Sequence, residues 1–524
     1  MRIAVVGGGP GGLFLATLLR RAAPNVEVTV FERNRAQDTF GFGVVFSDRT
    51  LANIHDADPV LREALDRHGR HWDVIEVRLK GERIRCGGNG MASVVRHTLL
   101  RLMQERAADV GAALRFSTPA SLAQLRDFDL VVAADGTGST VRCELTEAGV
   151  DLGETVTTAA AKFIWFGVDH MFDGLTFLHE RGPHGVFAVH GYPISDEVST
   201  FIVETDEQSW HAAGLDRFDV EQAPGPSDEQ SRRYLEELFG EQIGGARLLT
   251  NNSRWGNFRT RRTARWTTLH PVPVALLGDA VHTAHFSVGS GTKMAMEDAV
   301  ALCAALTEHR SDIAAALAAY EAAAQPSVRA VQDSARPSLA WWENFGRYHD
   351  HFAPWQFGYH FLTRSITDAR LSRRDPEFVA AAHRAWRATH GAQVLDTPFE
   401  HAGLSLPNRR VPVVHAAGVP VAAGGSPLHE RPPGTRPWAA RLAAPETEAG
   451  LSEAAAVLAV LADGDPTFVA VHGGTGFTRT LLCERARMHH KTPALLIDPD
   501  GDPDRAVTAV LSGRADLVAA EGLA

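Results

Sequence analysis

Cysteine is scarce in this chain of 524 residues, and its four cysteines are scattered without a C-x-x-C spacing. This usage argues against a disulfide framework and against a zinc site, and we expect no metal ion. The first apolar run, Ile3 to Val6, is too short and too soon followed by glycines for a signal peptide. No run approaches the length of a membrane span. We therefore expect a cytoplasmic protein with reduced thiols and no membrane partner.

The sequence also lacks an excess of positive charge. Its formal net charge is −11, and charges of both signs are mixed along the chain. A nucleic-acid backbone is bound by clustered Lys and Arg, so nucleic acid is not an expected partner. The hydrophobic content of 44% is ordinary for a globular protein. The length allows roughly two to four domains.

The composition changes in the last quarter of the chain. From about Val411 to Pro445 the sequence is rich in Pro, Gly and Ala, which is typical of a linker. We predict an α/β protein with three parts: a module over 1–380 whose substrate-covering sheet occupies about 155–270, a linker region over 381–446, and a small α/β region over 447–524. In that last region the patterns predict helices at 448–461, 478–488 and 503–511 and strands at 467–471, 494–497 and 515–519.

A glycine-rich turn follows the first predicted strand. Arg2–Val6 leads into Gly7-Gly8-Gly9-Pro10-Gly11-Gly12, and a helical pattern follows. G-x-G-x-x-G between a strand and a helix indicates dinucleotide binding. Gly7 permits the tight turn, Gly9 lets a pyrophosphate approach the backbone, and Gly12 lets the helix pack on the strand. The helix N-terminus offers free N–H groups to the phosphates.

A second predicted strand, Glu27–Phe31, ends beside Glu32 and Arg33. Glu32 follows Gly12 by twenty residues, where a carboxylate can accept hydrogen bonds from the adenosine ribose. With Gly11, these residues complete the nucleotide site predicted from this part of the chain. The glycine pattern alone leaves NAD and FAD open.

Two later motifs favour FAD. The predicted strand 129–134 leads into Asp135-Gly136-Thr137-Gly138-Ser139-Thr140-Val141-Arg142, and the predicted strand 274–277 leads into Gly278-Asp279-Ala280-Val281-His282. They match the D-G-x-x-S-x-x-R and G-D-A-x-H signatures of FAD-dependent hydroxylases. Asp279, between a strand and a helix, is placed to bond the ribityl hydroxyls of the flavin.

A second helix N-terminus completes the predicted FAD site. Gly289-Ser290-Gly291 and Thr292 would bring it beneath the flavin or its phosphates, where the helix dipole favours the anionic reduced flavin. Arg96 matches an arginine that these hydroxylases place against FAD. Its alternative is a solvated arginine at a helix end.

These motifs, in this order over residues 1 to about 375, resemble the aromatic hydroxylases of the para-hydroxybenzoate hydroxylase fold. The resemblance implies a Rossmann-type FAD-binding domain with an inserted mixed β-sheet. Four runs resemble the salicylyl-CoA 5-hydroxylase and anthraniloyl-CoA monooxygenase subfamily: 38–48, 201–205, 210–215 and 282–293.

The narrower resemblance implies hydroxylation with NAD(P)H and O₂, through a flavin hydroperoxide. The implied substrate is a salicyloyl or anthraniloyl group carried as a CoA or carrier-protein thioester, hydroxylated at the 5-position. Members of this subfamily often carry a C-terminal barrel like that of old yellow enzyme, and Gly403–Arg409 and Ser512–Ala519 resemble its opening and a late strand. A full barrel needs roughly 250 residues, about twice what this region offers, so we interpret the tail as a shortened barrel and a poor candidate for binding FMN. Within it, the run 472–476 either holds a phosphate or forms a plain strand–helix loop.

The segment between the motifs predicts strands at 162–168, 175–179, 185–192 and 199–204, a sheet that covers the flavin. On it we expect His190 and Tyr192, together with His285, to contact a substrate hydroxyl, amine or carbonyl. Apolar walls of the substrate site are predicted at Phe46, Trp165 and Phe286. For each of these residues the alternative is ordinary packing.

Two further runs have open interpretations. The basic run 257–265 either receives phosphates of CoA or pantetheine or forms a solvated surface strand. The aromatic run 339–361 closes the site, packs between subunits of a homo-oligomer, or belongs to the core.

Several alternatives remain at this stage. A free aromatic acid or natural-product intermediate could replace the thioester, and the choices between CoA and carrier protein and between NADH and NADPH stay open. A flavin oxidase or halogenase could use the same fold, although the W-x-W-x-I-P run of halogenases is missing. A non-catalytic FAD-binding protein that docks a carrier is the alternative outside enzymes.

Overall fold

The computed structural model describes residues 1–39, 41–220, 225–416, 419–421, 427–434 and 437–519. The chain forms two compact units, the first of residues 1–81 and 88–346 and the second of residues 82–87 and 347–524. Part of the predicted linker, Gly424 to Ser426, lies outside the described residues. The domain limits at 380 and 446 stay predictions.

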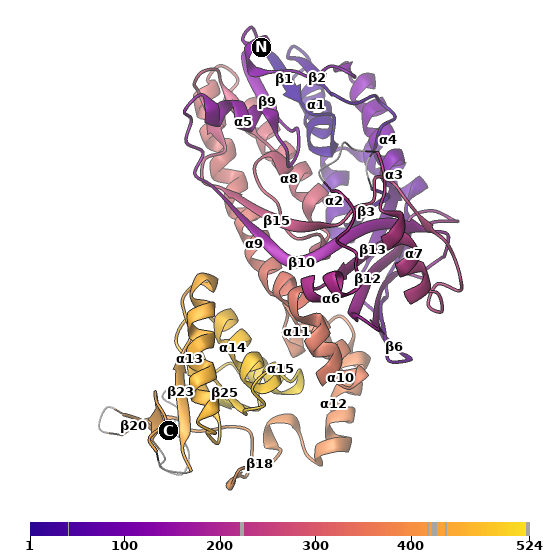
Figure 1. Ribbon diagram of the computed structural model, residues 1–524. Coiled ribbons are helices and arrows are strands. Elements are labelled where there is room, and N and C mark those ends of the chain that lie inside the picture. The colour runs from indigo at the N-terminus through magenta and orange to yellow at the C-terminus, as the bar shows by residue number, and fades with distance from the viewer. Residues whose placement is uncertain (40, 221–224, 417–418, 422–426, 435–436, 520–524) are drawn as a thin grey trace. The chain divides into compact units, whose positions relative to one another are not determined.

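The first unit begins with a Rossmann-type layer of strands and helices (Figure 1). Its elements are β1 (Arg2–Val6), α1 (Pro10–Ala22), β2 (Glu27–Phe31), α4 (Arg96–Asp109), β8 (Ala113–Arg115), η1 (Leu122–Leu125), β9 (Leu130–Ala133), α5 (Thr140–Glu147), β16 (Thr267–Thr268), β17 (Val274–Leu276), η2 (Gly278–Ala280), η3 (Phe286–Val288), α8 (Gly291–Glu308) and α9 (Ile313–His351).

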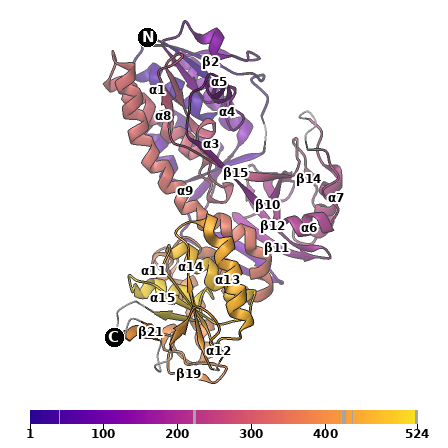
Figure 2. The same cartoon turned by 60° about the vertical axis from the view of Figure 1, so that its left-hand side comes forward.

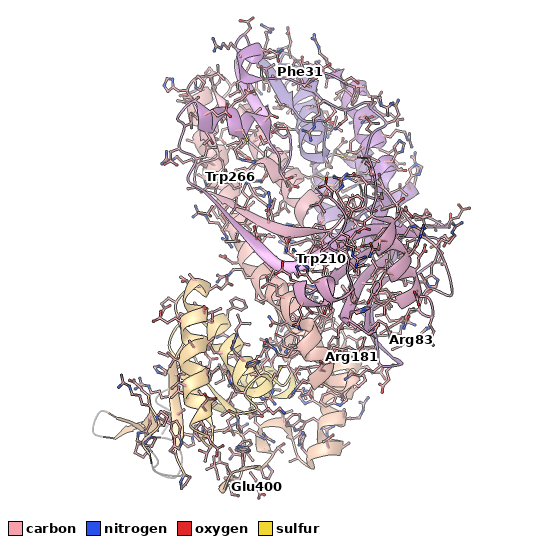
Figure 3. All side chains as sticks on the ribbon, viewed as in Figure 1. Phe31, Arg83, Arg181, Trp210, Trp266 and Glu400 are labelled. Carbon is pink, nitrogen blue, oxygen red and sulfur yellow. The ribbon has the colours of Figure 1, made fainter. Side chains whose placement is uncertain are left out.

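These strands form one sheet in the order β16-β17-β9-β1-β2-β8. The central strand β1 pairs in parallel with β2 and with β9, and residues 3–6 and 130–133 are buried. Such uninterrupted aliphatic runs suit a parallel sheet that is covered on both faces. Phe31, labelled in Figure 3, ends β2 with its ring edge-on to that of Phe128, at a centroid distance of 5.9 Å.

A small sheet lies beside this layer, in the order β3-β7-β4. Its elements are β3 (Gly43–Ser47), α2 (Asp48–Ala57), α3 (Pro59–His68), β4 (Arg70–Trp72) and β7 (Met91–Val95). Ser47 caps α2, because its side chain accepts a hydrogen bond from the backbone N–H of Thr50. This sheet leads directly into Arg96 at the start of α4.

The larger mixed sheet runs in the order β14-β10-β13-β12-β11-β5, and β15 also pairs with β10. Its strands, with the helices that follow β13, are β5 (Ile75–Leu79), β10 (Glu154–Val168), β11 (Leu175–Gly182), β12 (Gly185–Pro193), β13 (Ser199–Thr205), α6 (Glu207–Ala212), α7 (Glu229–Leu238), β14 (Leu248–Leu249) and β15 (Gly256–Thr263). The four strands predicted for this region are confirmed, with β10 starting earlier than expected.

The two faces of this sheet differ in chemistry. One face is an apolar cluster in which Phe166, Val189 and Phe201 pack with residues of α7 such as Leu235. Because side chains alternate along a strand, the intervening residues point the other way. The register pairs His190 and Trp165 with the same residue, Ile202, and pairs Phe163 with Glu204. That second face therefore carries the polar and aromatic residues of the candidate site.

The second unit contains a parallel sheet in the order β22-β23-β24-β25-β26 (Figure 2). Its elements are β6 (Glu82–Cys86), α10 (Pro354–Leu362), α11 (Asp368–Ser372), α12 (Pro376–His390), η4 (Val394–Asp396), β18 (Phe399–His401), β19 (Leu404–Leu406), β20 (Val414–Ala416), β21 (Val419–Val421), β22 (Leu428–His429), β23 (Ala439–Ala443), η5 (Glu448–Gly450), α13 (Leu451–Asp463), β24 (Val469–His472), α14 (Gly476–Met488), β25 (Ala494–Ile497), α15 (Pro503–Leu511) and β26 (Leu517–Ala519).

The alternating pattern predicted for this region is confirmed, and β25 and α15 have the predicted bounds. Arg410, just after the run that resembles a barrel's opening, forms a parallel bridge with Val518 in β26. In a closed barrel the first and last strands are neighbours in this way. Within the described residues, however, β22 forms the other edge of the sheet, so the sheet is open there and a shortened barrel stays a prediction.

None of the helices in the described ranges is both long and apolar enough to cross a membrane.

A buried carboxylate organises the interior of the second unit. Glu484 accepts a hydrogen bond from the Tyr348 hydroxyl at 2.6 Å and lies 3.2 Å from Nε2 of His360 and 3.4 Å from Nε of Arg514. Burial alone would raise the pKa of Glu484, but the bond to His360 and the charge of Arg514 hold it below its usual value. The ionised form therefore belongs to the folded state.

We predict that Glu484→Ala lowers the free energy of unfolding of this unit by about 3–5 kcal/mol at pH 7, because Arg514 keeps a buried charge without its partner. A carboxyl with a lowered folded pKa stabilises the fold above its unfolded pKa and loses that effect as the pH falls through the folded value. The difference between wild type and variant in urea unfolding should therefore shrink on acidification. Glu453→Ala, at an exposed position of α13, is the control. An equal loss from both variants would contradict the prediction.

Candidate active site

The glycine turn has the geometry of a phosphate-binding loop. Gly7 has φ of 111°, and a Cβ there would lie 2.3 Å from the carbonyl oxygen of Ala134. A Cβ on Gly12 would lie 2.2 Å from the carbonyl oxygen of Gly7. A Cβ on Gly9 would meet nothing within 4 Å. Gly7 and Gly12 are thus required by packing, whereas Gly9 leaves open room in front of the N-terminus of α1.

Glu32 connects the second strand to this turn. Its carboxylate accepts hydrogen bonds from the backbone N–H groups of Gly8 and Asn34, each at 2.8 Å. The neighbouring Arg33 is exposed. A Cβ on Gly11 would lie 2.5 Å from Cδ2 of Leu277, so Gly11 permits close packing of α1 against the residue after β17.

The two hydroxylase motifs are tied to each other. Asp135 accepts from the N–H of Thr140 at 2.7 Å, and its other oxygen, Oδ1, is buried with no hydrogen-bond partner in the described part of the chain. Arg142 donates to the carbonyl oxygens of Thr137 and Ala280 and so holds the loop that contains Gly136 next to the loop that contains Asp279.

Asp279 and Arg96 are opposite charges in one concave region. Asp279 is exposed by surface area, yet protein surrounds its carboxylate closely enough that burial raises its pKa, while His282, Arg96 and Arg261 act in the other direction. Burial lowers the pKa of Arg96, and Asp279 opposes that shift. A carboxylate that protein surrounds on most sides and that solvent still reaches on one side lines a concave site.

The N-terminus of α8 supplies the last part of this region. Ser290 precedes the helix, and its buried Oγ has no hydrogen-bond partner within the described ranges. The first turn, which begins with Gly291 and Thr292 after Gly289, contains no acidic residue. Several features of this region fit a dinucleotide such as FAD. There is open room at Gly9, Asp135 and Ser290 have unpaired polar atoms, and neither helix N-terminus is neutralised by an acidic residue.

Beside this region lies a buried cluster of two histidines and a glutamate. Nε2 of His190 is 2.6 Å from Oε1 of Glu204, and Nε2 of His285 is 3.7 Å from Oε2. Glu204 is 1% exposed. The structure thus brings together two of the predicted catalytic residues and adds Glu204, which the sequence indicates only through its position in a run that resembles the thioester hydroxylases.

Burial also shifts the titration of this cluster. It raises the pKa of Glu204 well above its usual value, and the Glu343 carboxylate adds to the shift. At 2.6 Å, Glu204 and His190 form a short hydrogen bond. Nδ1 of His285 lies 3.4 Å from the backbone N–H of Ser287 and 2.8 Å from its Oγ, and these contacts orient the ring with Nε2 on the side of Glu204. Ser287 in turn lies 2.9 Å, Oγ to Oγ, from Ser338 of α9.

Aromatic rings surround the cluster. The ring centroid of Phe286 lies 5.1 Å from that of Phe163 and 5.3 Å from that of His190, and the ring of Trp342 lies 4.1 Å from His190. The indole N–H of Trp165, on the same face of the sheet, is buried and has no hydrogen-bond partner among the described residues.

The remaining two predicted residues, Tyr192 and Phe46, belong to two different hydrophobic clusters. Tyr192 donates to the carbonyl oxygen of Gly43 and stacks on Trp72 at 6.2 Å, and burial raises its pKa to about 12. Tyr192 belongs to the same hydrophobic cluster as Trp165 and Phe286, and the charge of Arg96 acts against the rise of its pKa. Phe46 is buried in the core cluster of the Rossmann layer with Ile3 and Val5. The structure therefore assigns Phe46 to packing in this core. The sequence alone could not show this, because an aromatic residue in a strand does not reveal which layer its side chain faces.

With this geometry in place, comparison with known proteins is informative. A family described as "FAD binding domain" matches residues 1–335. A salicyloyl-CoA 5-hydroxylase of Streptomyces is 53% identical over 99% of each chain. A 3-hydroxy-4-methyl-anthranilyl-(aryl-carrier protein) 5-monooxygenase of Streptosporangium sibiricum is 37% identical over 65% of this chain and 89% of its own. The crystal structure of a 2-methyl-3-hydroxypyridine-5-carboxylic acid oxygenase has a TM-score of 0.53 at 18% identity, over 70% of this chain and 98% of its own.

The solved structure establishes the fold class, a flavin hydroxylase fold of mixed α/β type. The chain belongs to the family of the FAD binding domain, and it is an FAD-dependent monooxygenase with NAD(P)H as co-substrate. The predictions of cofactor, enzyme class and fold are confirmed. The alignment with the Streptomyces relative covers 99% of that protein, so it includes the C-terminal region of this chain.

We predict that Gly9→Ala folds like wild type but binds FAD at least about tenfold more weakly, because the added methyl group meets nothing in the protein and would press on the pyrophosphate. Gly7→Ala, whose methyl group would meet backbone, should lose stability as well as FAD. Thermal unfolding of flavin-free protein and titration with FAD measure the two effects separately. Unchanged FAD affinity in Gly9→Ala would place the pyrophosphate elsewhere.

Proposed function

We propose that this enzyme hydroxylates the aromatic ring of a salicyloyl or anthraniloyl group carried as a CoA thioester, at the 5-position. The observation that carries the proposal is the buried pair of His190 and Glu204 with His285, set among aromatic rings beside the predicted flavin site. The salicyloyl-CoA 5-hydroxylase with 53% identity over 99% of both chains supports the choice of substrate.

FAD, when bound, supplies the activated oxygen atom that an electron-rich ring attacks. The residues of this chain prepare the ring for that attack. A hydroxyl or amino group on the ring donates electrons more strongly as it gives up its proton, and Glu204 with His190 forms a buried acceptor for that proton. His285, held by Ser287 and Ser338, faces Glu204 with its Nε2 and keeps the acceptor in one position.

The aromatic residues define the remaining contacts. Phe286 and Phe163 exclude water from the ring, which protects the reactive oxygen and strengthens the hydrogen bonds of the cluster. Trp165 has a buried indole N–H with no partner in the described chain, and that donor suits the carbonyl oxygen of the substrate's thioester.

CoA is favoured over a carrier protein by the extent of similarity. The relative that acts on a CoA thioester aligns with 99% of this chain, whereas the relative that acts on a carrier-bound substrate aligns with 65%. In the basic strand β15, Arg261 pairs with Glu154 and Arg262 with Asp333, while Arg259 is exposed.

We expect salicyloyl-CoA or anthraniloyl-CoA to accelerate NAD(P)H oxidation by the FAD-loaded enzyme and to yield a thioester heavier by one oxygen atom. Mass spectrometry of the products identifies the ring position after hydrolysis. The free acids and the matching carrier-protein thioesters run in parallel. Hydroxylation of a free acid or a carrier thioester in preference to both CoA thioesters would refute the proposed substrate, and peroxide without an oxygenated product would indicate an oxidase.

We further predict that Glu204→Gln lowers product formation by roughly 10²–10⁴-fold, because the amide keeps the shape of the side chain but cannot take a proton. FAD content should not change, and NAD(P)H oxidation should continue with release of peroxide. Glu207→Gln, at an exposed position two residues beyond the end of β13, is the matched control. Full product formation by Glu204→Gln would remove Glu204 from the proposed mechanism.

A further inference from the structure

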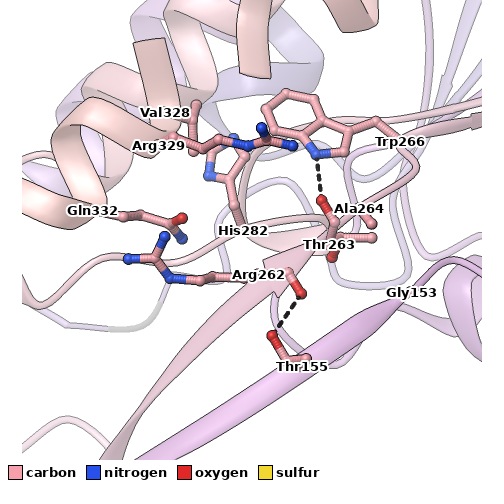
Figure 4. A pocket seen from close by; sticks show the side chains of 10 residues that line it. All are labelled: Gly153, Thr155, Arg262, Thr263, Ala264, Trp266, His282, Val328, Arg329 and Gln332. Atoms are coloured by element: carbon pink, nitrogen blue, oxygen red, sulfur yellow. Dashed lines mark hydrogen bonds between the residues drawn. The ribbon is translucent and has the colours of Figure 1, made fainter. Parts of the chain in front are cut away.

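A cavity of about 200 Å³ opens in the first unit away from the Glu204 cluster. The start of β10, the end of β15, the loop after η2 and the middle of α9 form its walls, and Figure 4 shows the side chains that line it. Three of them can be positive: Arg262, His282 and Arg329. No carboxylate is among the described residues that line it, although the chain as a whole is acidic.

His282 provides a buried donor on the inner wall. The residue is 1% exposed, its Nε2 lies 2.7 Å from Oδ2 of Asp298, and its Nδ1 has no hydrogen-bond partner in another described residue. Burial alone would lower the pKa of His282, but Asp298 and Asp279 raise it above its usual value. The imidazolium donates one N–H to Asp298 and adds a positive charge to the inner wall of the cavity.

The two arginines lie nearer the solvent. Arg262 pairs with Asp333 at 2.9 Å, and Arg329 donates through one nitrogen to Gln325. Each guanidinium has five N–H donors, so both keep donors for an anion in the cavity. Gln332, by contrast, uses its amide N–H groups on the carbonyl oxygens of Arg261 and Thr283 and serves as wall.

We propose that this cavity binds the phosphate monoester on the ribose of a nucleotide substrate. Such a group has a charge of about −1.5 to −2 at neutral pH and three acceptor oxygens, which suits three cationic donors. The proposal builds on the proposed function. Two reactants of that function carry such a phosphate: CoA at its 3′ position and NADPH at its 2′ position. NADH and pantetheine lack this group.

The cavity is also linked to the flavin contact. Asp298 accepts a hydrogen bond from the backbone N–H of Gly278 at 2.9 Å with the same oxygen that faces His282, and Gly278 immediately precedes Asp279. An anion in the cavity favours the imidazolium of His282 and therefore the ion pair with Asp298 that holds this loop. Nucleotide binding would thus hold Asp279 more rigidly in its position.

Calorimetric titration of the FAD-loaded enzyme with 2′,5′-ADP, 3′,5′-ADP, 5′-AMP and inorganic phosphate tests the proposal. We expect one of the two bisphosphates to bind at least about tenfold more tightly than 5′-AMP, the gain of one charge-assisted contact. Arg329→Gln should abolish that gain and Arg329→Lys should retain most of it. Arg265→Gln, at an exposed position outside the cavity and paired with Asp151, should change nothing.

The preferred bisphosphate identifies the source. Preference for 3′,5′-ADP assigns the cavity to CoA, and Arg329→Gln should then raise the KM for the CoA thioester but not for its 3′-dephospho analogue. Preference for 2′,5′-ADP assigns it to NADPH, and the variant should then lose its preference for NADPH over NADH. Equal binding of all nucleotides, a gain that survives in Arg329→Gln, or binding of inorganic phosphate alone as an adventitious ion would each overturn the proposal.

The binding arms need no turnover, so they separate this proposal from the preceding one. If no aryl-CoA is hydroxylated but a bisphosphate binds with the expected variant pattern, the cavity stands and the proposed substrate falls. If aryl-CoA is hydroxylated but the binding of neither bisphosphate depends on Arg329, the proposed substrate stands and the proposed cavity falls.

Discussion

Side-chain alternation in the mixed sheet is the constraint on which the candidate site depends. β12 and β13 are buried on both faces, so each of their residues must satisfy one of two environments. One face needs only apolar packing against α7. The other can hold a buried carboxylate such as Glu204 only because His190 lies on the neighbouring strand at hydrogen-bond distance. A shift of register by one residue would exchange the two faces and abolish the site.

The features predicted best are those whose physical cause is local. Gly7 and Gly12 are glycines because a Cβ would collide with backbone two or three ångströms away, and that need is visible in the motif itself. The helix α15 and the strand β25 have composition and boundaries that already specify them. FAD and the monooxygenase class followed from three such motifs in order.

Features that depend on contacts between distant segments could not be predicted in the same way. Glu204 is the ionisable residue of β13, but its role follows from His190 across the sheet and His285 from another loop. The sequence predicts Phe46 as an apolar wall of the substrate site, whereas in the structure its strand in the small sheet packs it into the Rossmann core. The sequence allows three interpretations of the aromatic run that contains Trp342. It cannot decide between them, because the contact of the Trp342 ring with His190 depends on the position of α9.

The hydrogen bonds of Asp298 have a consequence for changing this enzyme by design. One oxygen of this carboxylate serves both the imidazole of His282 and the backbone of Gly278. Substitutions at the outer rim, where Arg329 is exposed, leave that junction intact, whereas substitutions at His282 disturb the cavity and the flavin loop together. If the cavity binds a nucleotide as proposed, substitutions at the rim would change nucleotide preference without loss of the cofactor, whereas substitutions at the inner wall would change both.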